Sequence, residues 1–102
     1  MRILVVDDDP GLAFLMSAAL NRDGYDATGV ATLQEAKTAP GPWDVIVADV
    51  HLPNGDGREL QTLYPGVPMV IISGLPYERP TLVKPFSMVQ LRELVRHALE
   101  KP

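Results

Sequence analysis

Cysteine is absent from this chain of 102 residues, and it also lacks long apolar runs and clusters of basic residues. The absence of cysteine excludes thiolate catalysis, cysteine-ligated zinc and disulfide bonds. No apolar run approaches the roughly 20 residues that a membrane-spanning helix needs. Nine Lys and Arg against 13 Asp and Glu give a net charge of −4. This balance argues against direct binding to nucleic acid, which requires clustered positive charge.

The composition fits one small folded domain over residues 1–102. Hydrophobic residues make up 46% of the chain and charged residues 22%, as in an ordinary globular protein. A chain of this length can bury one core. Met1 leads directly into a strand-like segment, without the basic and apolar regions of a signal peptide. We therefore expect a cytoplasmic protein that does not enter a membrane.

Short apolar runs alternate with amphipathic stretches, which predicts βαβα units and a parallel sheet. The five strand-like segments span residues 3–6, 25–30, 45–48, 69–72 and 82–83. Most of them are apolar at consecutive positions, as expected for strands that are covered on both faces. The second segment is more polar, which predicts a strand at the edge of the sheet.

Capping residues mark the two longest predicted helices. Asp9 before Pro10 predicts a helix start, and Gly24 predicts the end of the same helix. Ser87 and Gln90 have the spacing of a capping box at the start of the last helix. Two shorter helices are expected over residues 32–39 and 58–64.

Polar side chains follow four of the five strand-like segments. Asp7 and Asp8 follow the first segment and Asp49 follows the third. Ser73 follows the fourth segment and Lys84 follows the fifth. The carboxyl ends of parallel strands share one edge of the sheet, where ligands bind. We therefore expect these five side chains to converge there.

The chemistry of this set favours a divalent cation and a phosphoryl group. Carboxylates in a small pocket raise each other's pKa values. Mg²⁺ relieves this repulsion, because it commonly binds one or two carboxylates together with water and phosphate oxygen. Ser73 and Lys84 supply a hydroxyl donor and a positive charge for an incoming phosphoryl group. The set therefore suggests phosphoryl transfer to a carboxylate, which is a known type of covalent intermediate.

Five segments of the chain resemble response-regulator receiver domains of two-component phosphorelay systems. They are ILVVDDDP at 3–10, VIVADVHLP at 45–53, the GDG turn at 55–57, VIISG at 70–74 and LVKPF at 82–86. The segments occur in the family's order along nearly the whole chain. The resemblance implies a flavodoxin-like, doubly wound α/β fold with a five-stranded parallel sheet in the order 2-1-3-4-5.

The resemblance also implies a metal site and an acceptor. Asp7, Asp8 and Asp49 are similar to the family's Mg²⁺ ligands, and the backbone carbonyl of His51 matches its main-chain ligand. Asp49 matches the phosphoacceptor. The implied function is therefore a phosphoacceptor switch and not an enzyme, with only self-phosphorylation and autodephosphorylation chemistry.

The remaining matched residues are implied to bind the phosphoryl group. Ser73 matches a hydroxyl residue that bonds to one phosphoryl oxygen, and Lys84 matches a lysine that pairs with another. The bond between Lys84 and Pro85 is expected to be cis, as in the family. The implied phosphodonor is a histidine kinase or a histidine phosphotransfer protein, and the output partner is unknown.

The chain departs from the family between Ser73 and Lys84. Only ten residues separate them, and these include two prolines and a glycine. This composition disfavours a regular helix, so we expect the fourth helix of the family to be missing or reduced to a turn. Thr81 occupies the position at which the family usually has an aromatic switch residue, and Tyr77 is a candidate substitute.

Three alternatives stay open at this stage. The chain could be a degenerate receiver that acts as an interaction module, or a receiver cut from a longer protein such as a hybrid kinase. It could also be a small Mg²⁺-dependent aspartyl phosphohydrolase, although that class usually has an acid where this chain has His51. The imidazole of His51 is either a solvated loop side chain or a group beside the phosphoryl group that tunes its hydrolysis.

Overall fold

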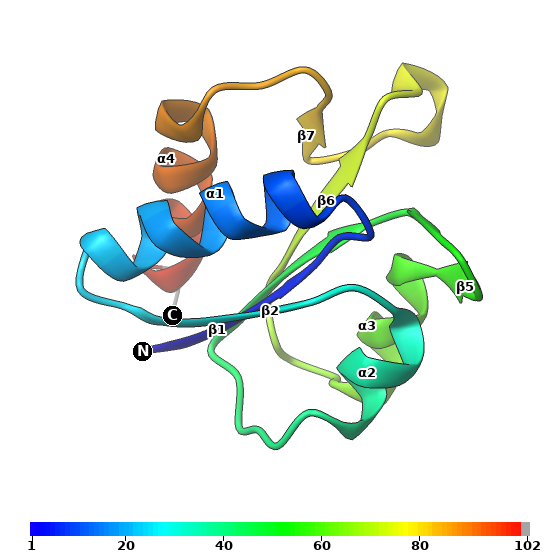
Figure 1. The fold of residues 1–102 in the computed structure, drawn as a ribbon, viewed down its shortest axis with the longest axis horizontal. Coiled ribbons are helices and arrows are strands. Elements are labelled where there is room, and N and C mark those ends of the chain that lie inside the picture. Colours follow the sequence, from blue (N-terminus) through cyan, green and yellow to red (C-terminus); the bar gives the residue numbers. More distant parts are fainter. Residues whose placement is uncertain (101–102) are drawn as a thin grey trace.

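The computed structural model describes residues 1–100, which form a five-stranded parallel sheet between two layers of helices (Figure 1). The strand order is β2-β1-β3-β6-β7. Their bounds are β1 (Arg2–Val6), β2 (Asp26–Val30), β3 (Val45–Asp49), β6 (Met69–Ser73) and β7 (Leu82–Val83). When the sheet strands alone are counted along the chain, this is the predicted order 2-1-3-4-5, which is therefore confirmed.

Residues 101 and 102 lie outside the described residues, and with them the predicted end of the last helix. Within residues 1–100, there is no helix with the length and hydrophobicity needed to cross a lipid bilayer.

The two faces of the sheet are covered by different helices (Figure 1). Helices α1 (Pro10–Arg22) and α4 (Met88–Glu100) lie on one face. Helices α2 (Leu33–Thr38) and α3 (Leu60–Leu63) lie on the other. Alternate residues of β1 point to opposite faces, so that Ile3 and Val5 join one apolar cluster while Leu4 and Val6 join the other. This double burial explains why the central strands are apolar at consecutive positions.

Local capping fixes both ends of α1 and the start of α4. The Asp9 carboxylate accepts hydrogen bonds from the N–H groups of Gly11 and Leu12, at 3.0 and 3.2 Å. Gly24 follows α1 with a φ of 93°, a conformation that favours glycine. Ser87 and Gln90 exchange hydrogen bonds of 2.8 and 3.1 Å. These three predictions are confirmed.

The region after β3 differs from the prediction. A two-stranded antiparallel hairpin, β4 (His51–Leu52) with β5 (Gly55–Asp56), occupies what the sequence presented as a loop. The helix expected over residues 58–64 is wrong in part, because it begins as the 3₁₀ turn η1 (Gly57–Glu59) and only α3 is α-helical. The Asp56 side chain caps η1, and the capping box with Glu59 favours this early, tight start.

The fourth helix of the family is reduced to a single 3₁₀ turn, η2 (Pro76–Glu78), as the sequence predicts. Pro76 is suited to the first position of a turn because it lacks an N–H group. Arg79 then adopts a φ of 55° and ends the turn, and Pro80 follows. The Lys84–Pro85 bond is cis, as expected, and the Gly41–Pro42 bond is also cis.

Candidate functional site

The polar residues predicted to converge lie together at the carboxyl end of the sheet. Asp49 and Ser73 are the last residues of β3 and β6, and Asp7 and Lys84 directly follow β1 and β7. Backbone hydrogen bonds continue past the strands, since the N–H of Lys84 donates to the carbonyl of Ser73 at 2.9 Å. The parallel register therefore brings the side chains to one edge of the sheet.

Three carboxylates form the acidic cluster of this edge. Oxygen atoms of Asp7, Asp8 and Asp49 all lie within 4.8 Å of one another. Asp7 is fully buried and Asp49 is almost fully buried, whereas Asp8 is exposed. Oδ1 of Asp7 accepts a hydrogen bond from the N–H of Asp9 at 2.9 Å, but its buried Oδ2 accepts none. This oxygen is therefore a buried polar atom without a hydrogen bond.

Burial is the main cause that raises the pKa of Asp7 above its usual value of 3.8, and the charge of Asp49 adds to it. The hydrogen bond from Asp9 and the positive charge of Lys84 act in the opposite direction without cancelling the shift. The ionised form of Asp7 is therefore held at a cost in free energy, which a bound cation would offset.

Lys84 is the counter-charge of the cluster. Its Nζ lies 2.5 Å from Oδ2 of Asp49, as a hydrogen-bonded ion pair, and 3.3 Å from Oδ2 of Asp7. The second contact is an ion pair without hydrogen-bond geometry. Burial opposes the charged form of Lys84, but the hydrogen bond to Asp49 and the charges of Asp7 and Asp49 outweigh it and raise its pKa. Lys84 is therefore a permanent cation between two of the three carboxylates.

The residues present fit a Mg²⁺ ion. Three carboxylates face one ammonium group, so that the site has an excess of negative charge that a divalent cation can balance. The donors are all oxygen atoms, which Mg²⁺ prefers, and Oδ2 of Asp7 has no hydrogen-bond donor of its own. The N–H of His51 donates to Oδ1 of Asp49 at 2.9 Å. The predicted ligand role of the His51 carbonyl stays a prediction.

Ser73 is buried at the same edge, and its hydroxyl contacts a residue that the sequence analysis missed. Its Oγ donates a hydrogen bond to Oε1 of Glu78 at 2.5 Å and accepts one from the N–H of Leu75 at 2.9 Å. Glu78 is the last residue of η2. A single acid in an irregular segment has no pattern from which this contact could be predicted.

Glu78 also contacts His51. Its Oε1 lies 2.9 Å from Nε2 of the His51 imidazole, whose side chain is 59% exposed. The hydrogen bond from Ser73 lowers the pKa of Glu78 most, and the hydrogen bond and charge of His51 lower it further. The His51 imidazole is thus largely solvated, as the simpler of the two hypotheses has it, and it is also paired with an acid. Its effect on hydrolysis stays a prediction.

Gly57 allows the hairpin to lie against the end of β3. Its N–H donates to the carbonyl of Val50 at 3.2 Å. A Cβ atom added at Gly57 would overlap the backbone oxygen of Asp49 and lie 3.1 Å from Cβ of Ala48. Only glycine permits this close approach. It brings the residue that follows the hairpin against the backbone of Asp49.

Thr81, at the position of the family's aromatic switch residue, and Tyr77, the candidate substitute, have different surroundings. Oγ1 of Thr81 accepts a hydrogen bond from the N–H of Ile71 at 3.1 Å. This bond links the segment that follows η2 to β6. Tyr77 lies on η2 with 78% of its surface exposed. Its role as a substitute aromatic switch stays a prediction.

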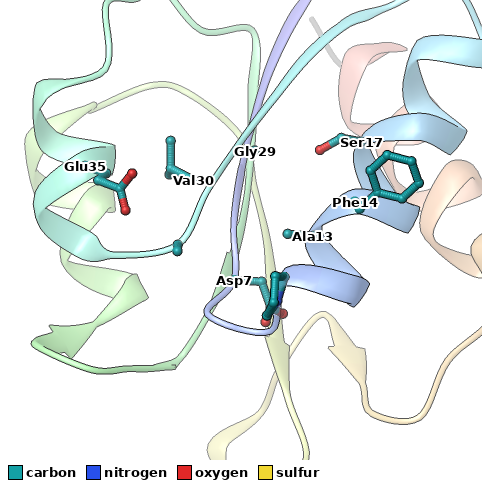
Figure 2. A pocket seen from close by; sticks show the side chains of 9 residues that line it. Asp7, Ala13, Phe14, Ser17, Gly29, Val30 and Glu35 are labelled. Carbon is teal, nitrogen blue, oxygen red and sulfur yellow. The ribbon is translucent and has the colours of Figure 1, made fainter.

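An exposed groove borders the site on the side of Asp7 (Figure 2). Phe14 and Ser17 of α1 form one wall, and Gly29 of β2 and Glu35 of α2 lie across from them. Phe14 is 71% exposed although it is a large apolar residue. The acidic edge therefore has an apolar surface beside it.

Comparison with known proteins places this geometry in a family. The family model for the response regulator receiver domain matches residues 3–79. The sensor kinase CckA of Brucella abortus is 32% identical in an alignment that covers 97% of this chain but only 12% of CckA. The chain likewise spans 17% of a two-component response regulator of Oryza sativa, at 31% identity. It therefore corresponds to a small part of these curated relatives.

Solved structures show the same fold over their whole length. The chemotaxis response regulator CheY4 of Vibrio cholerae has a TM-score of 0.82 and 26% identity, with 96% of this chain and 98% of that chain covered. The response regulator TrrA of Thermotoga maritima, solved in complex with Mg²⁺–BeF, has a TM-score of 0.84 and 25% identity, with the same coverage of both chains.

Proposed function

Because the chain belongs to the family of response regulator receiver domains, we propose that it accepts a phosphoryl group on Asp49 in a Mg²⁺-dependent reaction and then changes conformation to regulate a partner. The observation that supports this most is the contact set at one edge of the sheet. Asp7 and Asp49 lie with Asp8 in a cluster of carboxylates, and Lys84 pairs with two of them. A catalyst of phosphoryl transfer needs little beyond such positioned charges.

In the proposed reaction, a carboxylate oxygen of Asp49 attacks the phosphorus of a phosphohistidine in line. The bond between phosphorus and the imidazole nitrogen breaks as the bond to the Asp49 oxygen forms, and the leaving nitrogen takes up a proton from solvent. Lys84 moves its hydrogen bond from Asp49 onto a phosphoryl oxygen, and Ser73 donates to another. Asp7, Asp8 and Asp49 would hold Mg²⁺, which would neutralise charge on the transferring group.

The other parts of the proposal rest on family membership and on the composition of the chain. The phosphodonor is a histidine kinase or a histidine phosphotransfer protein, and the location is the cytoplasm. We expect no direct contact with nucleic acid or membrane, and no turnover of a separate substrate. The intact set of Asp8, Asp49, Ser73 and Lys84 argues against a degenerate receiver.

Incubation with a small phosphodonor and Mg²⁺, followed by measurement of the intact mass, tests the proposal. We expect one phosphoryl adduct on the wild type, none without Mg²⁺ and none on Asp49→Ala. Asp26→Ala is the matched control, because Asp26 is an exposed aspartate on the edge strand β2. An absent adduct on the wild type, or an equal adduct on Asp49→Ala, would contradict the proposal.

The hypothesis on His51 belongs to the same reaction. If its imidazole restricts access of water to the phosphoryl group, His51→Asn should lose the group faster than the wild type. The rate is measured after removal of the phosphodonor, by intact mass over time. Equal rates would end the hypothesis.

A further inference from the structure

The hydroxyl of Ser73 is already engaged in the unphosphorylated protein. A serine hydroxyl has one proton to donate. Ser73 donates it to Oε1 of Glu78 at 2.5 Å, and its oxygen accepts the N–H of Leu75 at 2.9 Å. Ser73 is fully buried, so solvent does not compete for this bond. The same proton is therefore not free for a phosphoryl oxygen while Glu78 holds it.

Glu78 is itself held in place from the opposite side. Its Oε1 lies 2.9 Å from Nε2 of His51, and its side chain is only 14% exposed. His51 begins β4, one residue after the end of β3 at Asp49. Glu78 thus joins the hairpin that follows β3 to the end of β6.

We propose that Glu78 is a positioning residue that keeps Ser73 from the phosphoryl group before phosphorylation, and that a phosphoryl oxygen then replaces its carboxylate as the acceptor of the Ser73 hydroxyl. This inference rests on the proposed function. No covalent bond changes in the exchange, since one hydrogen-bond acceptor replaces another. The negative charge of Glu78 is repelled by the incoming phosphoryl group, which favours its departure.

The exchange connects the site to the protein surface. Glu78 ends η2, the turn that stands where the family has its fourth helix, and the neighbouring Tyr77 is 78% exposed. Release of Glu78 removes the side-chain bond that ties η2 to Ser73. Residues 74–81 are therefore the segment that responds to phosphorylation, and they offer a partner a surface that differs between the two states.

The first test uses the unphosphorylated protein in a metal chelator. Unfolding by urea is measured for Ser73→Ala, Glu78→Ala and the double variant. If the two side chains hold each other, the loss in the double variant is smaller than the sum of the losses in the single variants. Additive losses would show that the contact is not formed and would overturn the inference, whether or not the protein accepts a phosphoryl group.

The second test measures binding of beryllofluoride, a phosphoryl mimic, in saturating Mg²⁺. Glu78→Ala should bind it about tenfold more tightly than the wild type, as expected for removal of a charged competing acceptor. Glu78→Gln, which keeps an acceptor oxygen without the charge, should lie between the two. Glu93→Gln should match the wild type, because Glu93 is an exposed acid of α4 that is paired with Arg96.

Combining Glu78→Ala with Ser73→Ala distinguishes release of the Ser73 hydroxyl from a general effect of the Glu78 charge. In Ser73→Ala, the gain from Glu78→Ala should shrink several-fold, because no hydroxyl remains to be released. An equal gain in beryllofluoride affinity with and without the Ser73 hydroxyl would overturn this inference, as would no gain in Glu78→Ala. Neither result would count against the proposed function. Failure of the wild type to bind beryllofluoride would count against the proposed function, whereas the unfolding measurements would still decide whether Glu78 holds Ser73.

Discussion

At the scale of single residues, Lys84 decides the charge balance of the site. It pairs with Asp49 at 2.5 Å and with Asp7 at 3.3 Å, and so it occupies the position of a cation among carboxylates. A metal ion that binds beside it is repelled by its charge, and the carboxylates must share their attraction between the two cations. The same ammonium is placed to stabilise a phosphoryl group on Asp49. In the proposed function, Lys84 therefore opposes metal binding and favours phosphoryl transfer.

We expect Lys84→Ala to separate these two effects. Removal of the competing cation should tighten Mg²⁺ binding by about threefold to tenfold, because like charges repel at short range. The rate of phosphorylation by a small phosphodonor should fall at the same time, since a positive charge on the transferring group is lost. Calorimetry measures the first quantity and intact mass over time measures the second.

Lys37→Ala is the control for this variant. Lys37 is an exposed lysine whose ion pair with Glu59 has a separation of 3.8 Å. Both quantities should equal those of the wild type in this variant. Weaker Mg²⁺ binding in Lys84→Ala would contradict the account of its charge.

Five of the site residues could be predicted because each follows an apolar run. The parallel sheet determines the positions of Asp7, Asp49, Ser73 and Lys84, because each ends a strand or directly follows one. Asp8 directly follows Asp7. Glu78 could not be predicted in this way. Its place depends on the turn η2 and on the left-handed conformation of Arg79, neither of which has a periodic signal in the sequence.

At the scale of elements, the hairpin of β4 and β5 supports the end of β3. The hairpin was missed because strands of two residues have no detectable alternation of apolar and polar positions. The hairpin packs against the end of β3 through Gly57, where a side chain would overlap the backbone of Asp49. The short helix after it was overestimated because the capping box starts a 3₁₀ turn before the α-helix begins.

Gly57→Ala should therefore destabilise the protein and displace Asp49. Overpacking of this kind costs roughly 1–3 kcal/mol of the free energy of unfolding. Thermal or urea unfolding measures the loss, and Mg²⁺ binding should weaken with it. Gly11→Ala is the control, because a Cβ at Gly11 makes only an ordinary contact at 3.4 Å with Asp9. A neutral effect of Gly57→Ala would contradict the close approach described here.

A second link between elements joins α1 to α4. Arg92 of α4 donates two hydrogen bonds to the carboxylate of Asp23 at the end of α1, both at 2.7 Å. The hydrogen bonds from Arg92 lower the pKa of Asp23 below its usual value of 3.8. A group with a depressed pKa contributes stability above its unfolded pKa and loses it as the pH falls through the folded value.

Arg92→Gln should therefore be less stable than the wild type at neutral pH by a small amount, because the pair is exposed to solvent. The difference should shrink as the pH falls from 3.8 through the lower pKa that Asp23 has in the folded protein. Urea unfolding at several pH values measures it, with Arg79→Gln as a control, because Arg79 is an exposed arginine that follows η2. A difference that grows at acid pH would contradict the linkage.

At the scale of the whole molecule, one sheet explains both the stability and the site. The alternation of apolar runs with amphipathic stretches predicted the α/β class correctly. The strand order came from the resemblance to receiver domains, since periodicity alone does not say which strands are neighbours. The sequence predicted that the family's fourth helix would be reduced, but not that η2 would turn its last side chain toward Ser73.

A crystal structure of the wild type with Mg²⁺ and beryllofluoride would show whether the acidic edge of the sheet is the site of phosphorylation. We expect a beryllofluoride group on a carboxylate oxygen of Asp49 and a Mg²⁺ ion about 2.0–2.1 Å from its oxygen ligands. These ligands should include Asp8 and Asp49, with Lys84 on a fluorine atom. A Mg²⁺ ion bound elsewhere, or beryllofluoride attached to another carboxylate, would contradict it.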